Sequence, residues 1–212
     1  MTSYKTLYRQ IFNTFGFPLT SGSAVSPAVI SAAEKRLGIR VPRPLRDYYA
    51  IAGNEKRFNR SHNRFLAPKH WFVDKGRVAF LDENQSVCFW GVKIAEDITD
   101  NPPIFQGTVE DRISWFREHS KCSLFIAVML HYQAVSGGLP YLGSSELTEN
   151  ANRRLKSDWN YVGQLHGQRA YSRQNQVVFL TSFFDSPILM AGAKTKDDLQ
   201  AIERDLGVKL DE

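Results

Sequence analysis

One segment near the start of the chain, AAEKRLGIRVPRPLRDYYAIAG from Ala32 to Gly53, constrains the fold more than any other. Its pattern predicts two short helices with a break between them. Gly38 ends the first helix, because glycine readily adopts the left-handed conformation that closes a helix. Pro42-Arg-Pro44 then starts the second helix. Upstream, Ser26 is a natural N-cap, and Pro27 takes the first helical position, where a missing N–H costs nothing.

Strand patterns come next along the chain. His70–Val73 and Arg77–Leu81 are rich in β-forming residues, and Asp74-Lys75-Gly76 separates them as a turn. The chain then reads DENQSVCFWGV from Asp82 to Val92, which is a polar tip followed by a returning strand, Val87–Val92. A β-hairpin with a polar turn is therefore expected after the two helices.

Hydrophobic periodicity predicts the remaining elements. Helices are expected at residues 4–15, after a cap at Thr108 (with Val109, Ile113 and Phe116 inward), at Cys122–Val135 and after a cap at Thr195 (with Leu199, Ile202 and Leu206 inward). Strands are expected at Trp159–Val162, Arg169–Ser172, Val177–Phe184 and Pro187–Ala193, and a polar, basic loop anchored by Phe58 and Phe65 at Asn54–Lys69.

Ala33–Val41 (AEKRLGIRV) resembles Ile202–Leu210 (IERDLGVKL), but the flanking residues do not match. A helix, a glycine stop and a short extended segment are a common combination, so local convergence is favoured over duplication. No Gly/Ser or Pro tract divides the chain. We therefore expect residues 1–212 to form a single domain.

Composition narrows the class of protein. The chain is 42% hydrophobic and 23% charged, as is usual for a globular protein. It has no apolar run of membrane-spanning length and no secretion signal, so a cytoplasmic protein is expected. The two cysteines, Cys88 and Cys122, stand in apolar runs and are expected to be free and buried. The net charge is +5, yet twelve basic and four acidic residues give +8 between Glu34 and Arg77 alone.

Motifs for catalysis or for cofactor binding are absent from the sequence. There is no phosphate-binding glycine loop and no serine-hydrolase elbow, and the five histidines are too scattered for a zinc site. We therefore expect no catalytic residue, no cofactor and no metal. Aromatic residues do alternate with arginines between Arg57 and Phe72, as in proteins that bind single-stranded nucleic acid. No known nucleic-acid-binding motif accompanies them.

The order and spacing of these pieces resemble the SUKH superfamily, also called the SMI1/KNR4 family. The first piece is the helix with Glu34, Leu37 and Gly38, then Val41-Pro42 and the helix with Tyr48-Tyr49 and Gly53. The second is Val78–Leu81, which leads into Glu83-Asn84-Gln85 and Phe89-Trp90-Gly91. Together they lie within residues 26–92, and residues 188–210 are similar to the final strand and helix of longer members.

This resemblance implies an α+β fold in which a curved, largely antiparallel sheet is flanked by helices. It also implies a non-enzymatic immunity protein that binds and neutralises a co-encoded toxin, since bacterial members act in this way, while fungal members are linked to cell-wall regulation. Aromatic and arginine residues dominate protein interfaces, and Trp71 and Trp90 would be anchors if exposed. The candidate partner-binding residues are Arg57, Arg60, Arg64, Trp71, Glu83, Asn84, Gln85 and Trp90. The alternative is a nucleic-acid-associated or regulatory protein that uses the basic stretch at residues 34–77.

Overall fold

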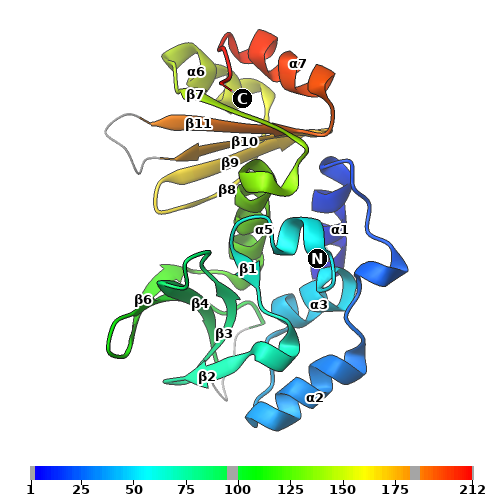
Figure 1. Cartoon of the computed structure of the whole chain (residues 1–212), viewed down its shortest axis with the longest axis vertical. Coiled ribbons are helices and arrows are strands. Elements are labelled where there is room, and N and C mark those ends of the chain that lie inside the picture. Colours follow the sequence, from blue (N-terminus) through cyan, green and yellow to red (C-terminus); the bar gives the residue numbers. More distant parts are fainter. Residues whose placement is uncertain (1–2, 95–99, 182–186, 212) are drawn as a thin grey trace. The chain divides into compact units, whose positions relative to one another are not determined.

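The computed structural model describes residues 3–94, 100–181 and 187–211, which form the mixture of helices and antiparallel strands seen in Figure 1. The expected α+β class is confirmed. The chain divides into two compact units: unit 1 is Met1–Arg9 with Leu19–Phe125, and unit 2 is Gln10–Pro18 with Ile126–Glu212. Helices α1 (Tyr4–Thr14) and α5 (Cys122–Gln133) contribute residues to both units. The single-domain expectation stays a prediction.

Helices α2 (Pro27–Leu37) and α3 (Arg43–Ala52) of unit 1 begin and end where the sequence predicts. The segment Asn54–Lys69, expected to be a loop, instead contains the short helix α4 (Lys56–Asn59) and a short strand at Arg64–Phe65. Single 3-10 turns lie at Ser21–Ser23 and Pro68–His70. The Ser26 side chain accepts a hydrogen bond from Val29 N, and Gly38 closes α2 with a φ of 65°. The Glu34 carboxylate accepts from Val41 N at 2.9 Å and also pairs with Arg46, so one side chain ties α2 to α3.

Unit 1 contains one antiparallel sheet, called sheet A here. Its strands are β1 (Arg64–Phe65), β2 (Phe72–Asp74), β3 (Arg77–Asp82), β4 (Cys88–Lys93), β5 (Ile104–Val109) and β6 (Ile113–His119). The order is β1-β3-β4-β5-β6, and β2 also pairs with β3. The predicted turn between β2 and β3 is present, with φ values of 44° at Lys75 and 69° at Gly76. Two positive φ values define the turn whose twist matches a tight hairpin.

The helix predicted after Thr108 is wrong. Residues 104–109 and 113–119 are strands β5 and β6, paired as a hairpin in which Thr108 lies opposite Ser114. Glu110 and Asp111, which suggested the first turn of a helix, lie in the connecting turn. Phe116, expected to face inward, is 60% exposed. Strand pairing therefore overrides a local sequence that is compatible with a helix cap.

Aromatic side chains fill the core of unit 1. Tyr8, Tyr48, Tyr49, Trp71 and Phe80 are each at most 1% exposed. Tyr49 and Trp71 meet edge to face with ring centroids 4.8 Å apart, and both side chains donate hydrogen bonds to the Leu66 carbonyl. The Tyr49 hydroxyl and the Trp71 indole N–H are therefore satisfied inside the core.

Unit 2 contains a second antiparallel sheet, called sheet B, in the order β7-β11-β10-β9-β8. Its elements are a π-helical turn (Ala134–Gly138), β7 (Tyr141–Glu146), α6 (Glu149–Asp158), β8 (Asn160–Leu165), β9 (Gln168–Arg173), β10 (Gln176–Thr181), β11 (Ile188–Ala193) and α7 (Lys196–Leu206). The strands and the last helix match expectation, except that residues 182–184 of one predicted strand lie outside the described residues. Strand β7 and helix α6 were not predicted, and the single sheet implied by the resemblance is replaced by two.

Helices lie on both faces of sheet B. On one face, the predicted inward residues of α7, Leu199, Ile202 and Leu206, pack with Leu155 of α6 in a core cluster. On the other, Tyr132 of α5 lies 5.2 Å from Phe179, measured between ring centroids. Helices therefore cover apolar side chains on each face of this sheet. No helix in the described parts of the chain is both long and apolar enough to cross a membrane.

Candidate binding surfaces

Several predicted site residues meet at the turn between β3 and β4. Arg64 on β1 reaches Asp82 at 2.6 Å and the Ser86 hydroxyl at 2.6 Å. The Glu83 carboxylate accepts a hydrogen bond from Gln85 N at 2.8 Å, and the Asn84 amide lies 3.2 Å from His62 Nε2. The structure thus brings Arg64 to the Glu83-Asn84-Gln85 turn and holds this turn in one conformation at the surface. The arrangement can present polar groups to a partner.

Arg57 and Arg60 are exposed in a different part of unit 1, in α4 and just after it. Arg60 borders a polar cavity of about 240 Å³, which is lined by Gly22, Gly53, Asn54, Glu55, Lys56, Asn59, Arg60, Phe65 and Ala67. The Glu55 carboxylate in its wall accepts from Arg57 N and from the Ser23 hydroxyl. Charges of both signs line this cavity, Lys56 and Arg60 beside Glu55.

Neither predicted tryptophan anchor is available at the surface. Trp71 is 1% exposed and donates its indole N–H to the Leu66 carbonyl at 3.0 Å. Trp90 is 8% exposed, and its ring centroid lies 6.2 Å from that of Phe125. The role proposed for these residues required exposure, so their contribution is to the core. Phe58 and Phe65 are buried anchors of their segment, as predicted.

A surface that the sequence did not predict lies on sheet A, on the side away from Trp90. We call it the outer face, and cross-strand pairing defines it, because directly paired residues point to the same side. One row across the sheet is Phe89, Gly107 and Trp115, and the next is Ala79, Gly91, Phe105 and Arg117. Strand pairing and alternation complete it with Phe72 on β2, Arg77 on β3, Lys93 on β4 and the valines at positions 87 and 109.

Trp115 lies against the two glycines of this face. A Cβ at Gly91 would come within 2.8 Å of the Trp115 ring, and one at Gly107 within 2.9 Å. The Trp115 indole N–H donates to Asp74 Oδ2 at 2.6 Å, and Lys75 Nζ donates to the Ile113 carbonyl at 2.7 Å. These hydrogen bonds join the β2–β3 hairpin to the far strand β6, so sheet A curls toward its outer face. The predicted curvature is therefore present in this sheet.

The outer face is apolar but is not closed off from solvent. Val87 is 56% and Val109 is 41% exposed, and Val109 N donates to the Val87 carbonyl at 2.9 Å. Phe89 and Phe105 are half-buried. On the opposite face, Trp90 and Phe80 pack against Phe125 of α5, and Phe116 on the outermost strand β6 stays exposed. Sheet A thus carries apolar residues on both faces, and those of the outer face are accessible.

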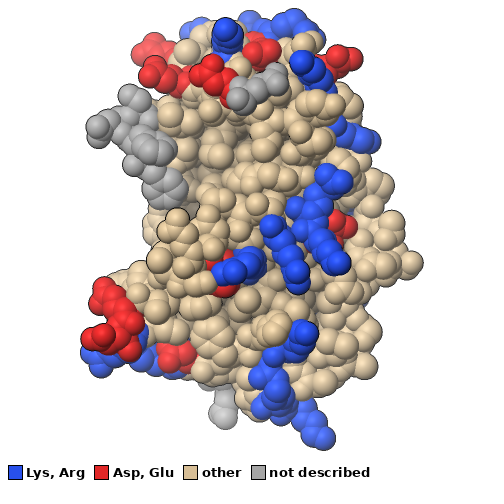
Figure 2. All heavy atoms as spheres, in the orientation of Figure 1, with Lys and Arg blue, Asp and Glu red and all other residues tan. Residues whose placement is uncertain are grey.

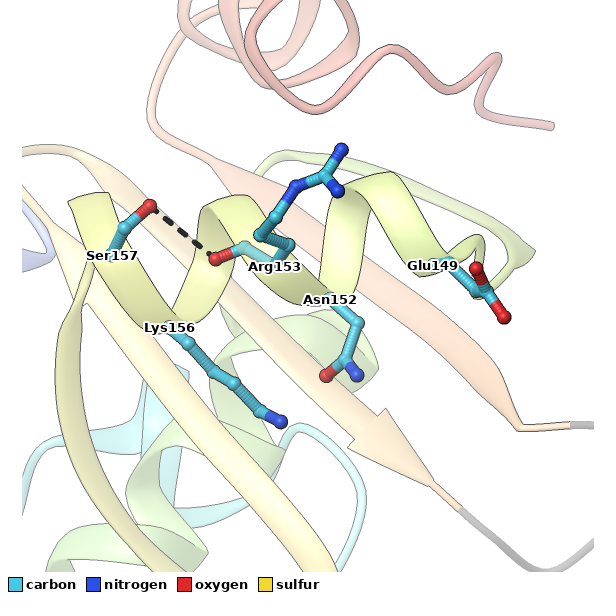
Figure 3. A pocket seen from close by; sticks show the side chains of 5 residues that line it. All are labelled: Glu149, Asn152, Arg153, Lys156 and Ser157. Atoms are coloured by element: carbon cyan, nitrogen blue, oxygen red, sulfur yellow. Dashed lines mark hydrogen bonds between the residues drawn. The ribbon is translucent and has the colours of Figure 1, made fainter.

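A hollow on α6 in unit 2 does not form a comparable site. It measures about 550 Å³ and is lined by Glu149, Asn152, Arg153, Lys156 and Ser157, all from one side of a single helix (Figure 3). These side chains do not converge on a common point (Figure 3). Asn152 Oδ1 is buried and has no hydrogen-bond partner among the described residues, yet no second element contributes a group to meet it.

The buried titratable groups have structural partners. His131 Nε2 lies 3.1 Å from the Ser172 hydroxyl, and Nδ1 lies 2.7 Å from the Ala127 carbonyl. Burial lowers the pKa of His131 to about 4. This serine–histidine pair is only 1% exposed at the histidine and 6% at the serine, so substrate has no access to it.

Both cysteines are free and buried, as predicted, and burial raises the pKa of each thiol. Within the described ranges, no three His, Cys, Asp or Glu side chains gather in a way that could hold a metal ion.

Together the geometry defines an α+β protein with one accessible apolar sheet face in unit 1. Comparison with models of protein families, with curated proteins and with solved structures gives no match.

Proposed function

We propose that this chain is a non-enzymatic protein-binding module of the SUKH type, an immunity protein that neutralises a co-encoded toxin in the cytoplasm by occluding it. The observation that carries this proposal is the outer face of sheet A. Exposed apolar area is costly in water, and contiguous apolar patches of this kind usually mark binding surfaces. Burial of a valine or phenylalanine contributes about 1.5–3 kcal/mol, so a few such side chains supply much of the affinity that occlusion needs.

Occlusion also requires little chemistry from the binding protein. A rigid surface that covers the partner's active groups is sufficient, and sheet A is held rigid by its ladder of strands and by the Trp115–Asp74 bond. The polar Glu83-Asn84-Gln85 turn comes directly after β3 and leads into Val87. It can therefore supply polar contacts at the rim of an interface with an apolar centre.

The test is capture of a partner from the native host by the tagged protein, with nuclease treatment and a high-salt wash. We expect one protein to be retained at near-equal amounts and its own activity to be blocked by the purified chain. The double variant Val87→Lys/Val109→Lys should abolish capture, because it places two charges in the apolar centre. Val29→Lys is the matched control, since Val29 is 48% exposed on α2. Equal capture by both variants would contradict the use of the outer face.

A second candidate function is nucleic-acid binding by the basic part of unit 1. Figure 2 shows Lys and Arg side chains over the region of α2, α3 and α4, with few acidic ones among them. The described exposed cations of this region that have no acidic partner within ion-pair distance include Lys35, Arg36, Arg40, Lys56, Arg60 and Lys69. Phosphate binding weakens steeply with salt. Retention of RNA or DNA at low salt, with no protein surviving the wash, would favour this candidate over occlusion.

A further inference from the structure

The outer face of sheet A is electrically polarised along its strands. At the end near the β2–β3 turn stand Arg77, Lys93 and Arg117, with Asp74 as the one carboxylate among the described residues there, a net charge of +2. The Lys75 ammonium instead reaches the Ile113 carbonyl at the start of β6. At the opposite end, the β5–β6 turn exposes Glu110 and Asp111 beside Arg112. The apolar residues lie between these ends. A partner that fits must therefore be amphipathic and must bind in one orientation.

Arg77 is positioned before any partner arrives. Its guanidinium carbon lies 4.3 Å from the centroid of the Phe105 ring and 5.7 Å from that of Trp115. Its Nη1 donates to the Lys75 carbonyl at 2.8 Å, while Nε is buried and has no hydrogen-bond partner among the described residues. A guanidinium held on aromatic rings loses little freedom when it meets an anion. Arg117 is exposed and lies in the same cross-strand row as Phe105.

The carboxylate of Asp74 does not neutralise this cationic end completely. Its Oδ2 accepts the Trp115 indole N–H at 2.6 Å, which uses part of its hydrogen-bonding capacity within the protein. Trp115 in turn lies against Gly91 and Gly107. The aromatic ring, the acid and the glycines thus form one internal assembly, and the arginines remain for an incoming group.

We propose that the outer face binds an extended segment of the partner protein that carries apolar side chains and, on one side of them, a carboxylate that meets Arg117 and Arg77. This inference rests on the proposed function, because it specifies the partner of that same surface. Val109 and the Phe105–Arg117 row are four residues apart along β5, which is about 13 Å at 3.3–3.4 Å per residue. The segment therefore places its acidic residue about four positions from an apolar one.

Single-stranded nucleic acid is the competing occupant, because aromatic rings and arginines also bind bases and phosphates. Two features disfavour it. The part of the face next to the β5–β6 turn is aliphatic, with Val87, Val109 and Ile113, and aliphatic side chains give bases poor stacking surfaces. Glu110 and Asp111 at one end would repel a phosphate backbone that crosses the face. A protein segment with opposite charges at its two ends meets both ends favourably.

The experiment is selection of random displayed peptides, about 12 residues long so that they exceed the apolar-to-cationic distance when extended, on the immobilised full chain. We expect enriched sequences with Asp or Glu about four positions from Val, Ile, Leu or Phe. Affinity should fall about tenfold or more for Arg117→Glu and stay unchanged for Arg40→Glu, a matched exposed arginine between α2 and α3. Replacing the peptide's acid by Lys should restore binding to Arg117→Glu.

Three outcomes overturn the inference. The first is enrichment of peptides without an acidic preference, and the second is equal peptide affinity for Arg117→Glu and Arg40→Glu. The third is that every enriched peptide still binds Val87→Lys/Val109→Lys. If one of these occurs while the host partner is still captured, the proposed function stands and only the chemistry assigned to the partner segment fails. Binding of a labelled oligo(dT) that is lost in Val87→Lys/Val109→Lys would replace the protein segment by nucleic acid. Arg117→Gln, which only removes the charge, serves if Arg117→Glu unfolds as judged by circular dichroism.

Discussion

His131 should control the acid stability of unit 2. Its side chain is 1% exposed, and its ring contacts the Ala127 carbonyl and the Ser172 hydroxyl. A carbonyl oxygen can only accept, so we assign the ring proton to Nδ1, and the Ser172 hydroxyl donates to Nε2. The ring also packs edge to face against Phe15, with centroids 4.9 Å apart. This environment satisfies the neutral imidazole, whereas burial disfavours the imidazolium by more than the Ala127 carbonyl favours it.

The magnitude can be worked out from the pKa. Burial lowers the pKa of His131 from 6.5 to about 4, because a charged ring loses its hydration there. The unfolded chain takes up a proton as the pH falls through about 6.5, while the native state takes it up only near pH 4. The stabilising effect is therefore complete above pH 6.5, declines between pH 6.5 and 4, and changes no further below. Each unit of pKa shift is worth about 1.4 kcal/mol, so the free energy of unfolding falls by about 3 kcal/mol across this range.

The assay is urea unfolding of the wild type and of His131→Gln, whose side chain is neutral at every pH, at about pH 7 and pH 4. Protonation of the carboxylates changes the free energy of unfolding equally in both proteins, so this contribution cancels in the comparison. The free energy of unfolding of the wild type should fall by about 3 kcal/mol more than that of the variant. Equal pH dependence would refute the reasoning. If His131→Gln does not fold, NMR titration of the wild-type His131 ring decides, and a midpoint near 6.5 refutes it.

Three further perturbations test the packing, a helix cap and the buried thiols. Gly107→Ala should destabilise the protein by about 1–3 kcal/mol in urea unfolding, because the new Cβ would lie 2.9 Å from the Trp115 ring; an unchanged midpoint would contradict the contact. Thr195→Ala should cost about 1 kcal/mol in the same assay, since its hydroxyl accepts from Asp198 N at 3.1 Å, whereas Thr195→Ser should retain most of the stability. Cys88 and Cys122 should react with a thiol reagent near pH 8 only as fast as the protein unfolds, because burial raises the pKa of both thiols; rapid labelling under native conditions would disprove their burial.

Elements whose ends are encoded locally were predicted well. Ser26, Gly38 and Thr195 act through hydrogen bonds or backbone conformations within a few residues, so their neighbours in sequence are sufficient. The β2–β3 turn is of the same kind. Helix α6 was missed because it is strongly polar and buries only Ala151 and Leu155. A helix with so narrow an apolar stripe has almost no periodic signal.

The β5–β6 hairpin was missed for a different reason. Thr108 followed by two acidic residues satisfies the rules for a helix start, and nothing local excludes it. The competing signal was the alternation in residues 104–109 and 113–119, with the small Gly107 at the position where Trp115 lies. That signal becomes decisive only when the two segments are known to pair.

The candidate site depended on exposure, which a single sequence does not encode. Trp71 and Trp90 have the composition of interface anchors, yet both are in the core. The outer face could not be predicted because it is assembled from alternate residues of several strands. Its definition requires the register of each pair, for example Phe105 opposite Arg117, and a shift of one residue would send each of these side chains to the opposite face.

The internal echo between residues 33–41 and 202–210 now has a physical explanation. In both copies a glycine with φ near 65° ends a helix: Gly38 at 65° and Gly207 at 66°. In both copies, the glutamate four residues before this glycine accepts a hydrogen bond from a backbone N–H that lies seven residues after the glutamate. Glu34 binds Val41 N, and Glu203 binds Leu210 N, each at 2.9 Å. The two copies differ in the element that comes after them, because the first leads into helix α3 and the second into an isolated bridge to β7. The residues shared by the two segments therefore encode the same local helix C-terminal motif, which supports local convergence.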